Sequence, residues 1–193
     1  MKIVKSISLL TLSSVLLLAS PEVSKEKQLQ QIVATGDATA KILLKTLSSN
    51  LQEHMQNGGV MDAFAFCSNE AYPLTEKINK ELEKGVSVKR ISTQFRSPVN
   101  APKSDEKAVL ERLKTMQANN TLPPYILEQT DKKTFKYYKP LVIEKDTCLK
   151  CHGKIENDSE LAKVLVQRYP LDTAIDYKMN DIRGAVVVTI TKE

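Results

Sequence analysis

The stretch "GAVVVTIT", residues 184–191, decides the fold class of this 193-residue chain. Six of its eight residues are the β-branched types Val, Ile and Thr. Such side chains lose rotamer freedom in a helix and pack well on a pleated surface, so the stretch predicts a β-strand. Two further segments predict strands: residues 86–93 alternate apolar and polar side chains, and "TFKYYKPLVI", residues 134–143, forms one or two strands around Pro140.

Helical patterns occupy the first half of the chain. In residues 24–57, apolar side chains recur mostly at three- and four-residue steps, and the glycine pair at 58–59 ends the pattern. A second helix is expected over residues 61–84, with Pro73 bending or dividing it and Gly85 capping its end. The chain therefore begins with long helices.

Shorter elements follow these helices. Helices are expected over residues 104–118, with Ser104 as the N-cap, and over residues 159–168. Prolines make residues 97–102 an extended loop. Helices that come first and strands that dominate later predict a single α+β domain over residues 21–193, with an antiparallel β-sheet flanked by long N-terminal helices.

The first twenty residues have the pattern of a signal peptide. Lys2 and Lys5 precede an uncharged, largely apolar run over residues 6–19, and charges resume at Glu22. The run is shorter than the roughly 20 apolar residues of a spanning helix, which favours a secretory signal over residues 1–20. We therefore expect export to the periplasm, with membrane attachment only if this segment stays uncleaved.

Composition argues against nucleic-acid binding. The formal net charge is +5, and it falls to +3 without the two lysines of the predicted signal peptide. The remaining basic residues are interleaved with acidic ones, and they form no cluster with aromatic side chains. An apolar content of 41% is that of a folded chain rather than a disordered one.

The segment "CLKCH", residues 148–152, predicts a covalently attached haem c. Cys148 and Cys151 are spaced so that their thiols can add to the two vinyl groups on one edge of a porphyrin. His152 follows directly and can place its imidazole on the iron. The chain has only three cysteines and two histidines, so a chance cluster is improbable.

Two other readings of this segment compete with haem. Cys148 and Cys151 could form a redox-active disulfide, although such dithiols usually follow an early strand of a βαβ unit, which this chain lacks before the motif. A structural zinc site needs four ligands, and no second cysteine–histidine pair is present.

The second axial position of the iron would decide the function. Cys67 is a candidate ligand, because a free thiol in an exported protein is exposed to oxidation whereas a metal-bound thiolate is protected. Alternatively, Cys67 is a buried, inert cysteine on an apolar helix face and binds no metal. The remaining candidates are a lone histidine and the methionines: His54, Met55, Met61, Met116 and Met179.

Other side chains are candidates for the walls of the haem site. Arg90 and Arg96 could pair with haem propionates, since guanidinium binds carboxylates bidentately. Either Tyr137 or Tyr138 could line the pocket, but neighbours on a strand point to opposite faces.

Four segments resemble a family of small c-type haem domains with a PAS-like fold. They are Phe66-Cys67-Ser68 with Glu70-Ala71, "VKRISTQFRSPVNAP" at 88–102, "CLKCHG" at 148–153 and "DIRGAVVVTI" at 181–190. The resemblance extends from about Val60 to the end of the chain. It implies that the iron is held by His152 and by a cysteine that matches Cys67. Related domains are the extracytoplasmic input ends of histidine kinases. The chain departs from the family at Ser97, where asparagine usually precedes the proline.

These observations predict an exported, non-enzymatic protein with one haem c. It would act in redox or small-ligand sensing, or in low-potential electron transfer, because sulfur ligation stabilises ferric iron. The expected partners are a redox or signalling protein and a small gas ligand. The alternatives are a simple periplasmic electron carrier with a different sixth ligand and a peroxidase-like haem enzyme, for which only His54 could act as a distal acid-base group.

Overall fold

A computed structural model describes residues 21–192, so the predicted signal peptide lies outside the described residues. Its centre is a four-stranded antiparallel sheet with strand order β1-β4-β3-β2. The strands are β1 (Val86–Ile91), β2 (Ile126–Gln129), β3 (Thr134–Val142) and β4 (Ile182–Thr191). The β-branched run therefore forms one of the two inner strands, as its composition predicts.

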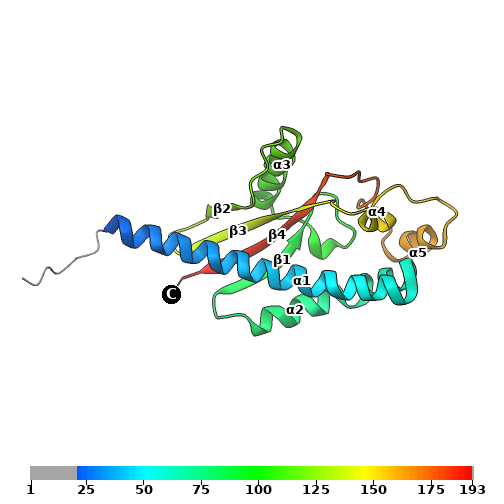
Figure 1. The fold of residues 1–193 in the computed structure, drawn as a ribbon, viewed down its shortest axis with the longest axis horizontal. Helices are drawn as coiled ribbons and strands as arrows, with labels where there is room; N and C mark the ends of the chain where they lie inside the picture. Colours follow the sequence, from blue (N-terminus) through cyan, green and yellow to red (C-terminus); the bar gives the residue numbers. More distant parts are fainter. Residues whose placement is uncertain (1–20, 193) are drawn as a thin grey trace, which may run out of the picture.

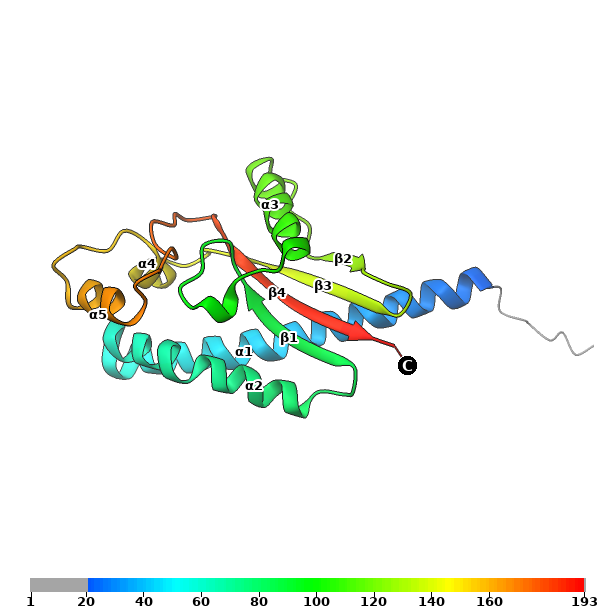
Figure 2. The same ribbon diagram turned by 180° about the vertical axis from the view of Figure 1, so that it is seen from behind.

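Helices cover both faces of this sheet (Figures 1 and 2). The long α1 crosses one face with α2 beside it, α3 lies on the other face, and α4 and α5 sit at the end of the sheet near the end of α1. The predicted α+β class is confirmed, and the arrangement is consistent with a PAS-like fold. The helices are α1 (Pro21–Asn69), α2 (Ala71–Glu81), α3 (Ser104–Ala118), α4 (Asp146–His152) and α5 (Glu160–Arg168), with a 3₁₀ turn η1 (Pro98–Asn100).

The alternation of β4 divides the core between the two faces of the sheet. Val186 and Val188 pack against α1 and α2, where Leu43 and Phe66 are buried. Val187 points the other way, into a cluster beneath α3. An inner strand buried on both faces needs apolar side chains at successive positions, which explains the run of three valines.

The helix boundaries differ from the prediction around the glycines. Gly59 has a φ of 70° and bends the chain, but helix resumes at once, so residues 60–69 form the end of α1. The expected division near Pro73 is confirmed, because α1 ends at Asn69 and α2 begins at Ala71. The predicted cap at Gly85 is wrong: α2 ends at Glu81. Gly85 instead turns the chain into β1 with a φ of 85° and accepts a hydrogen bond from the Thr191 N–H (2.8 Å).

The third helix is capped differently from the prediction. Ser104 is its first helical residue rather than its cap, and the Glu106 carboxylate accepts the backbone N–H of Lys103 (2.9 Å). A glutamate at this position closes the end of the helix as the second half of a capping box does.

The predicted strand around Pro140 is one continuous strand, β3. Its pairing with β2 ends at Tyr138, whereas its pairing with β4 continues past Pro140. Proline lacks a backbone N–H, and it is tolerated here because β3 has no second neighbour at this point. Within residues 21–192, no helix has both the length and the apolar character needed to cross a bilayer.

Candidate functional site

One cavity, called here the α1/α4 cavity, opens between the end of α1, helix α4 and the adjoining ends of β1 and β4. Its wall includes the residues that the sequence assigns to haem attachment, to the two axial positions and to the haem carboxylates: Cys67, Arg90, Arg96, Cys148, Cys151 and His152. The lining residues are Leu51, Met55, Phe64, Cys67, Ser68, Arg90, Arg96, Ser97, Asn100, Thr147, Cys148, Cys151, His152, Tyr169 and Arg183.

Helix α4 presents the two motif cysteines one turn apart. Cys148 and Cys151 are free thiols, and each is partly buried and faces the cavity. The helix ends at His152, and the Gly153 N–H bonds back to the Leu149 carbonyl (2.8 Å). Residues three positions apart share a helix face, so both sulfurs are available to one edge of a planar ligand.

The His152 imidazole is held in one tautomer. Its Nδ1 lies 2.8 Å from the carbonyl oxygen of Ala174, and since a carbonyl only accepts, Nδ1 carries the proton. Burial, reinforced by Arg183 and Arg96, lowers the pKa of His152 to about 3, although the bond to Ala174 acts in the opposite direction. At neutral pH the ring is therefore neutral, with the Nε2 lone pair available to a metal.

Cys67 is placed differently from the buried position that its apolar helix face indicated. Its side chain is exposed and lines the α1/α4 cavity from the end of α1. The surrounding walls limit hydration and raise the pKa of the thiol, while the three arginines of the cavity oppose the rise. Without a metal the group is a thiol at neutral pH, and metal binding would displace its proton.

The two predicted arginines have different surroundings. Arg96 is engaged by protein: its Nε donates to Asp172 (2.8 Å), and a terminal nitrogen donates to the Cys151 carbonyl (2.7 Å). The guanidinium of Arg90 makes no hydrogen bond or ion pair with any residue between 21 and 192. Burial removes water from the Arg90 guanidinium and so lowers its pKa. No carboxylate in this part of the chain compensates for this loss of hydration.

Arg183 is a cavity residue that sequence reasoning missed. The pairing of β3 with β4 slips here, from Leu141 opposite Gly184 to Val142 opposite Ile182, so Arg183 occupies a β-bulge. A bulge redirects a side chain out of the strand's alternation, and this one brings Arg183 to the cavity. Its guanidinium donates to the Gln94 carbonyl (3.0 Å) and lies 5.3 Å from the centre of the Tyr177 ring.

Among the other candidate axial ligands, only Met55 reaches the cavity. His54 binds Asp62 through Nδ1 (2.8 Å) and stacks on Phe66. Met61 packs in the cluster around Phe64, and Met179 lies beside α3 in a different hollow. Met116 is on α3 and does not line the cavity.

The expectation that Tyr137 or Tyr138 lines the site is wrong. Tyr137 packs beneath α1 with its hydroxyl bonded to Asp37 (3.2 Å), and Tyr138 is buried beneath α3. Tyr169 lines the cavity instead, and the Tyr177 ring meets His152 edge-on with 6.2 Å between ring centres. Both come from the segment after α4, where no periodic pattern marks them.

The donor set of the cavity is suited to haem rather than to a multidentate metal site. No group of three or more His, Cys, Asp and Glu side chains in the described part of the chain could hold a metal ion. The cavity instead offers two adjacent thiols, one neutral imidazole, one further thiol and unpaired cationic nitrogen. It also contains the Ser68 hydroxyl, which is buried and has no hydrogen-bond partner within residues 21–192. These groups fit a planar, carboxylate-bearing iron porphyrin.

Comparisons with known proteins agree with this architecture. A structure of similar fold is the crystal structure of the cyanobacterial heme-protein Tll0287, with a TM-score of 0.56 and 23% sequence identity over 91% of this chain and 98% of that chain. No curated protein matches the chain. The family model described as Tll0287-like matches residues 19–191. Since that match spans nearly the whole sequence, the chain belongs to the Tll0287-like family.

Proposed function

We propose that this protein carries one covalently attached haem c in the α1/α4 cavity. Cys148 and Cys151 would form the two thioether links, and His152 and Cys67 would be the axial ligands. The observation that carries the proposal is that the free thiols of α4, the Nε2 lone pair of His152 and the thiol of Cys67 face the same cavity. The structurally similar heme-protein supports the choice of cofactor.

The basic residues of the cavity would receive the haem carboxylates. Arg90 has no protein anion beside it, and Arg183 has only a carbonyl and an aromatic ring, so both retain donors for a carboxylate. Arg96 was predicted for the same role from the sequence, but Asp172 already occupies its Nε. Arg90 and Arg183 are therefore the better candidates.

The proposed role is redox or small-ligand sensing, or low-potential electron transfer. When bound, the haem would supply a one-electron couple and a site for a small gas ligand. A thiolate from Cys67 would favour the ferric state and lower the potential, and its release on reduction would open a coordination position. The proposal includes no catalytic turnover; the partner would be a redox or signalling protein in the periplasm, reached through the predicted signal peptide over residues 1–20. A relationship to histidine-kinase input domains belongs to the same proposal.

One observation favours a second function. Met55 lines the cavity from the same helix as Cys67. Histidine–methionine ligation raises the potential and is typical of electron-carrier cytochromes. A simple periplasmic carrier with Met55 on the iron is therefore the alternative that the experiment must separate.

The test is the low-temperature EPR spectrum of the ferric protein, matured in a host that attaches haem c, beside Cys67→Ser and Met55→Leu. We expect a low-spin signal of narrow g-spread that is lost in Cys67→Ser and unchanged in Met55→Leu. A low-spin signal that is lost in Met55→Leu and unchanged in Cys67→Ser would make Met55 the second axial ligand and would support the electron-carrier function. Mass spectrometry of the denatured protein tests attachment: Cys148→Ser with Cys151→Ser should abolish the added haem mass, whereas Lys150→Ala should retain it.

A further inference from the structure

A largely buried ion pair links the loop after β1 to the segment before β4. Arg96 and Asp172 lie 76 positions apart in the sequence, and their side chains are 12% and 9% exposed. Arg96 Nε is 2.8 Å from Asp172 Oδ2. Such a pair contributes little net stability, because desolvation offsets much of the Coulomb attraction. Its hydrogen bonds therefore point to a role in fixing geometry.

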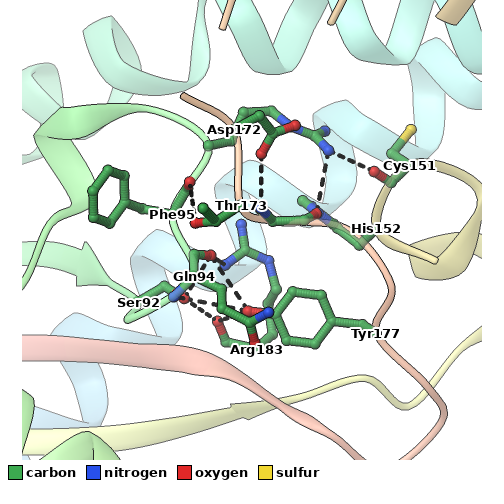
Figure 3. A network of polar contacts seen from close by, with 11 residues as sticks. Ser92, Gln94, Phe95, Cys151, His152, Asp172, Thr173, Tyr177 and Arg183 are labelled. Carbon is green, nitrogen blue, oxygen red and sulfur yellow. Dashed lines mark hydrogen bonds and ion pairs between the residues drawn. The ribbon is translucent and has the colours of Figure 1, made fainter. Parts of the chain in front are cut away.

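Both members of the pair also bind the segment that orients His152. Figure 3 shows the polar network that contains Asp172, Cys151 and His152. Asp172 Oδ1 accepts the Ala174 N–H (2.7 Å), and an Arg96 terminal nitrogen donates to the Ala174 carbonyl (3.3 Å). That carbonyl is the acceptor for His152 Nδ1–H (2.8 Å). The same Arg96 nitrogen donates to the carbonyl of Cys151, the residue just before His152.

The network thus fixes His152 at two points, the backbone of α4 beside it and the Nδ1 atom of its ring. Arg96 grips helix α4 at the backbone of Cys151, and the ion pair fixes the only protein group that hydrogen-bonds the ring within the described residues. Backbone bonds extend the contact, since the Tyr177 N–H donates to the His152 carbonyl (2.9 Å) and the Thr173 N–H donates to the Phe95 carbonyl (3.2 Å). Little freedom remains for the ring to rotate or to exchange tautomers.

We propose that Arg96 and Asp172 are positioning residues that hold the Ala174 carbonyl against His152 and so aim Nε2 into the α1/α4 cavity. The part of this inference that concerns iron rests on the proposed function. A metal-bound histidine commonly donates its other N–H to a carbonyl or carboxylate, which fixes the ring and raises its basicity. Here that carbonyl would itself be set by an ion pair, and Arg96 would bind protein rather than haem carboxylate.

The haem-free protein provides the first test. ¹⁵N NMR reports which ring nitrogen of His152 carries the proton, in the unchanged chain and in Arg96→Gln, Asp172→Asn and the double variant. We expect the Nδ1–H tautomer to dominate in the unchanged chain and its ratio to the Nε2–H tautomer to fall by about tenfold in each single variant, the equivalent of one hydrogen bond. Because the two residues act as a pair, the double variant should fall no further than either single variant.

Arg112→Gln is the matched control, since Arg112 also pairs with a carboxylate, that of Glu128 (2.6 Å), but belongs to α3 and does not line the α1/α4 cavity. It should leave the tautomer ratio unchanged. A change in Arg96→Gln with none in Asp172→Asn would overturn the proposal, and so would additive losses in the double variant. Asp172→Asn keeps the shape of the side chain and an oxygen for the Ala174 N–H, and near-UV circular dichroism identifies any variant that has lost its fold. A variant that loses its fold is replaced by Arg96→Lys, which keeps the charge but not the fork and should shift the ratio in the same direction.

The haem-loaded protein then separates positioning from carboxylate binding. If the pair aims His152, Asp172→Asn should split or broaden the low-spin EPR signal while the covalent haem mass remains. If Arg96 instead binds a haem carboxylate, Asp172→Asn should leave the signal unchanged, and Arg96→Gln should resemble Arg90→Gln. Absence of covalent haem from the unchanged chain would refute the proposed function, while the tautomer measurement would still decide the role of the pair.

Discussion

The sheet core and the α1/α4 cavity are built from different kinds of contact. In the core, side chains such as Val186 and Leu43 are fully buried against apolar neighbours, and their placement follows the alternation of a strand or the turn of a helix. Around the cavity, α4 and the segment after it are held by side chains that bind backbone carbonyls, as Arg96 does at Cys151. The core therefore supplies the free energy of folding, and the polar contacts supply the geometry of the site.

The largest effect on stability is expected in the core. Leu43 on α1 is completely buried against the sheet, whereas its neighbour Ile42 is 50% exposed. Leu43→Ala removes buried methyl groups and leaves a cavity, which should lower the free energy of unfolding by about 2–5 kcal/mol. Ile42→Ala should change it by less than about 0.5 kcal/mol. Urea unfolding measures both.

If the core and the cavity are independent in this way, folded Leu43→Ala and folded Ile42→Ala should both give the EPR spectrum of the unchanged haem-loaded protein. A shift in the EPR signal of folded Leu43→Ala would show that core packing and site geometry are coupled, and the division between the two regions would fail.

Gly184 tests the boundary between the two regions. A Cβ at this position would lie 2.1 Å from the carbonyl oxygen of Ile91, so the two strands approach too closely for any side chain. Gly184→Ala should cost about 1–3 kcal/mol through overpacking. Because the residue adjoins the bulge at Arg183, this variant should change the spectrum of the haem-loaded protein as well as its stability. An altered unfolding midpoint with an unaltered spectrum would place Gly184 in the core alone.

Sequence patterns predicted what depends on local residues. The β-branched run of β4, the amphipathic pattern of α1 and the motif from Cys148 to His152 each lie within one segment, and the structure brings them together as an α+β fold with one shared cavity. Strand β2, of four residues, and helix α4, of seven, are too short for a periodic pattern to stand out.

The features that sequence analysis missed depend on residues far apart in the chain. Arg183 reaches the cavity only because the pairing of β3 with β4 shifts by one residue. Arg96 and Asp172 are 76 positions apart in the sequence, and only the fold brings them into contact. Gly36 on α1 is a similar case, because a Cβ there would lie 2.4 Å from the Tyr137 ring, which is 101 positions away in the chain. Close approach of α1 to the sheet requires glycine at that position.

The face of the sheet opposite α1 provides a pH-dependent control. Glu106 is 1% exposed; burial alone would raise its pKa, but hydrogen bonds from Lys89 and from the Lys103 N–H outweigh burial and lower the pKa below 4.5. A group with a lowered folded pKa stabilises the protein above its unfolded pKa, and that stability is lost as the pH falls through the folded value. Stability should therefore decline from about pH 4.5 downward.

Glu106→Gln should remove the part of this decline that Glu106 contributes. At pH 7 the variant should lose about 1.5 kcal/mol, because the ammonium groups of Lys89 and Lys136 would face a neutral amide instead of a carboxylate. Urea midpoints between pH 3 and pH 7 measure both effects. The EPR signal should stay unchanged, since Glu106 is in the first turn of α3 and does not line the cavity. If the urea midpoint fell equally with pH in both proteins, the assignment to Glu106 would be contradicted.

The smallest effect is expected at His54, whose partly exposed ring stacks on the core residue Phe66 but does not line the cavity. It pairs with Asp62 across the bend at Gly59, and the two side chains are 30% and 42% exposed. Exposed pairs of this kind contribute about 0–1 kcal/mol, so His54→Gln should shift the urea midpoint only slightly. The ring does not line the cavity, and the EPR signal and the haem mass should therefore stay unchanged. A changed signal would bring His54 back as an axial ligand and would mean that α1 bends differently around the haem. An unchanged signal would leave the choice between Cys67 and Met55, the two sulfur residues that the end of α1 presents to His152.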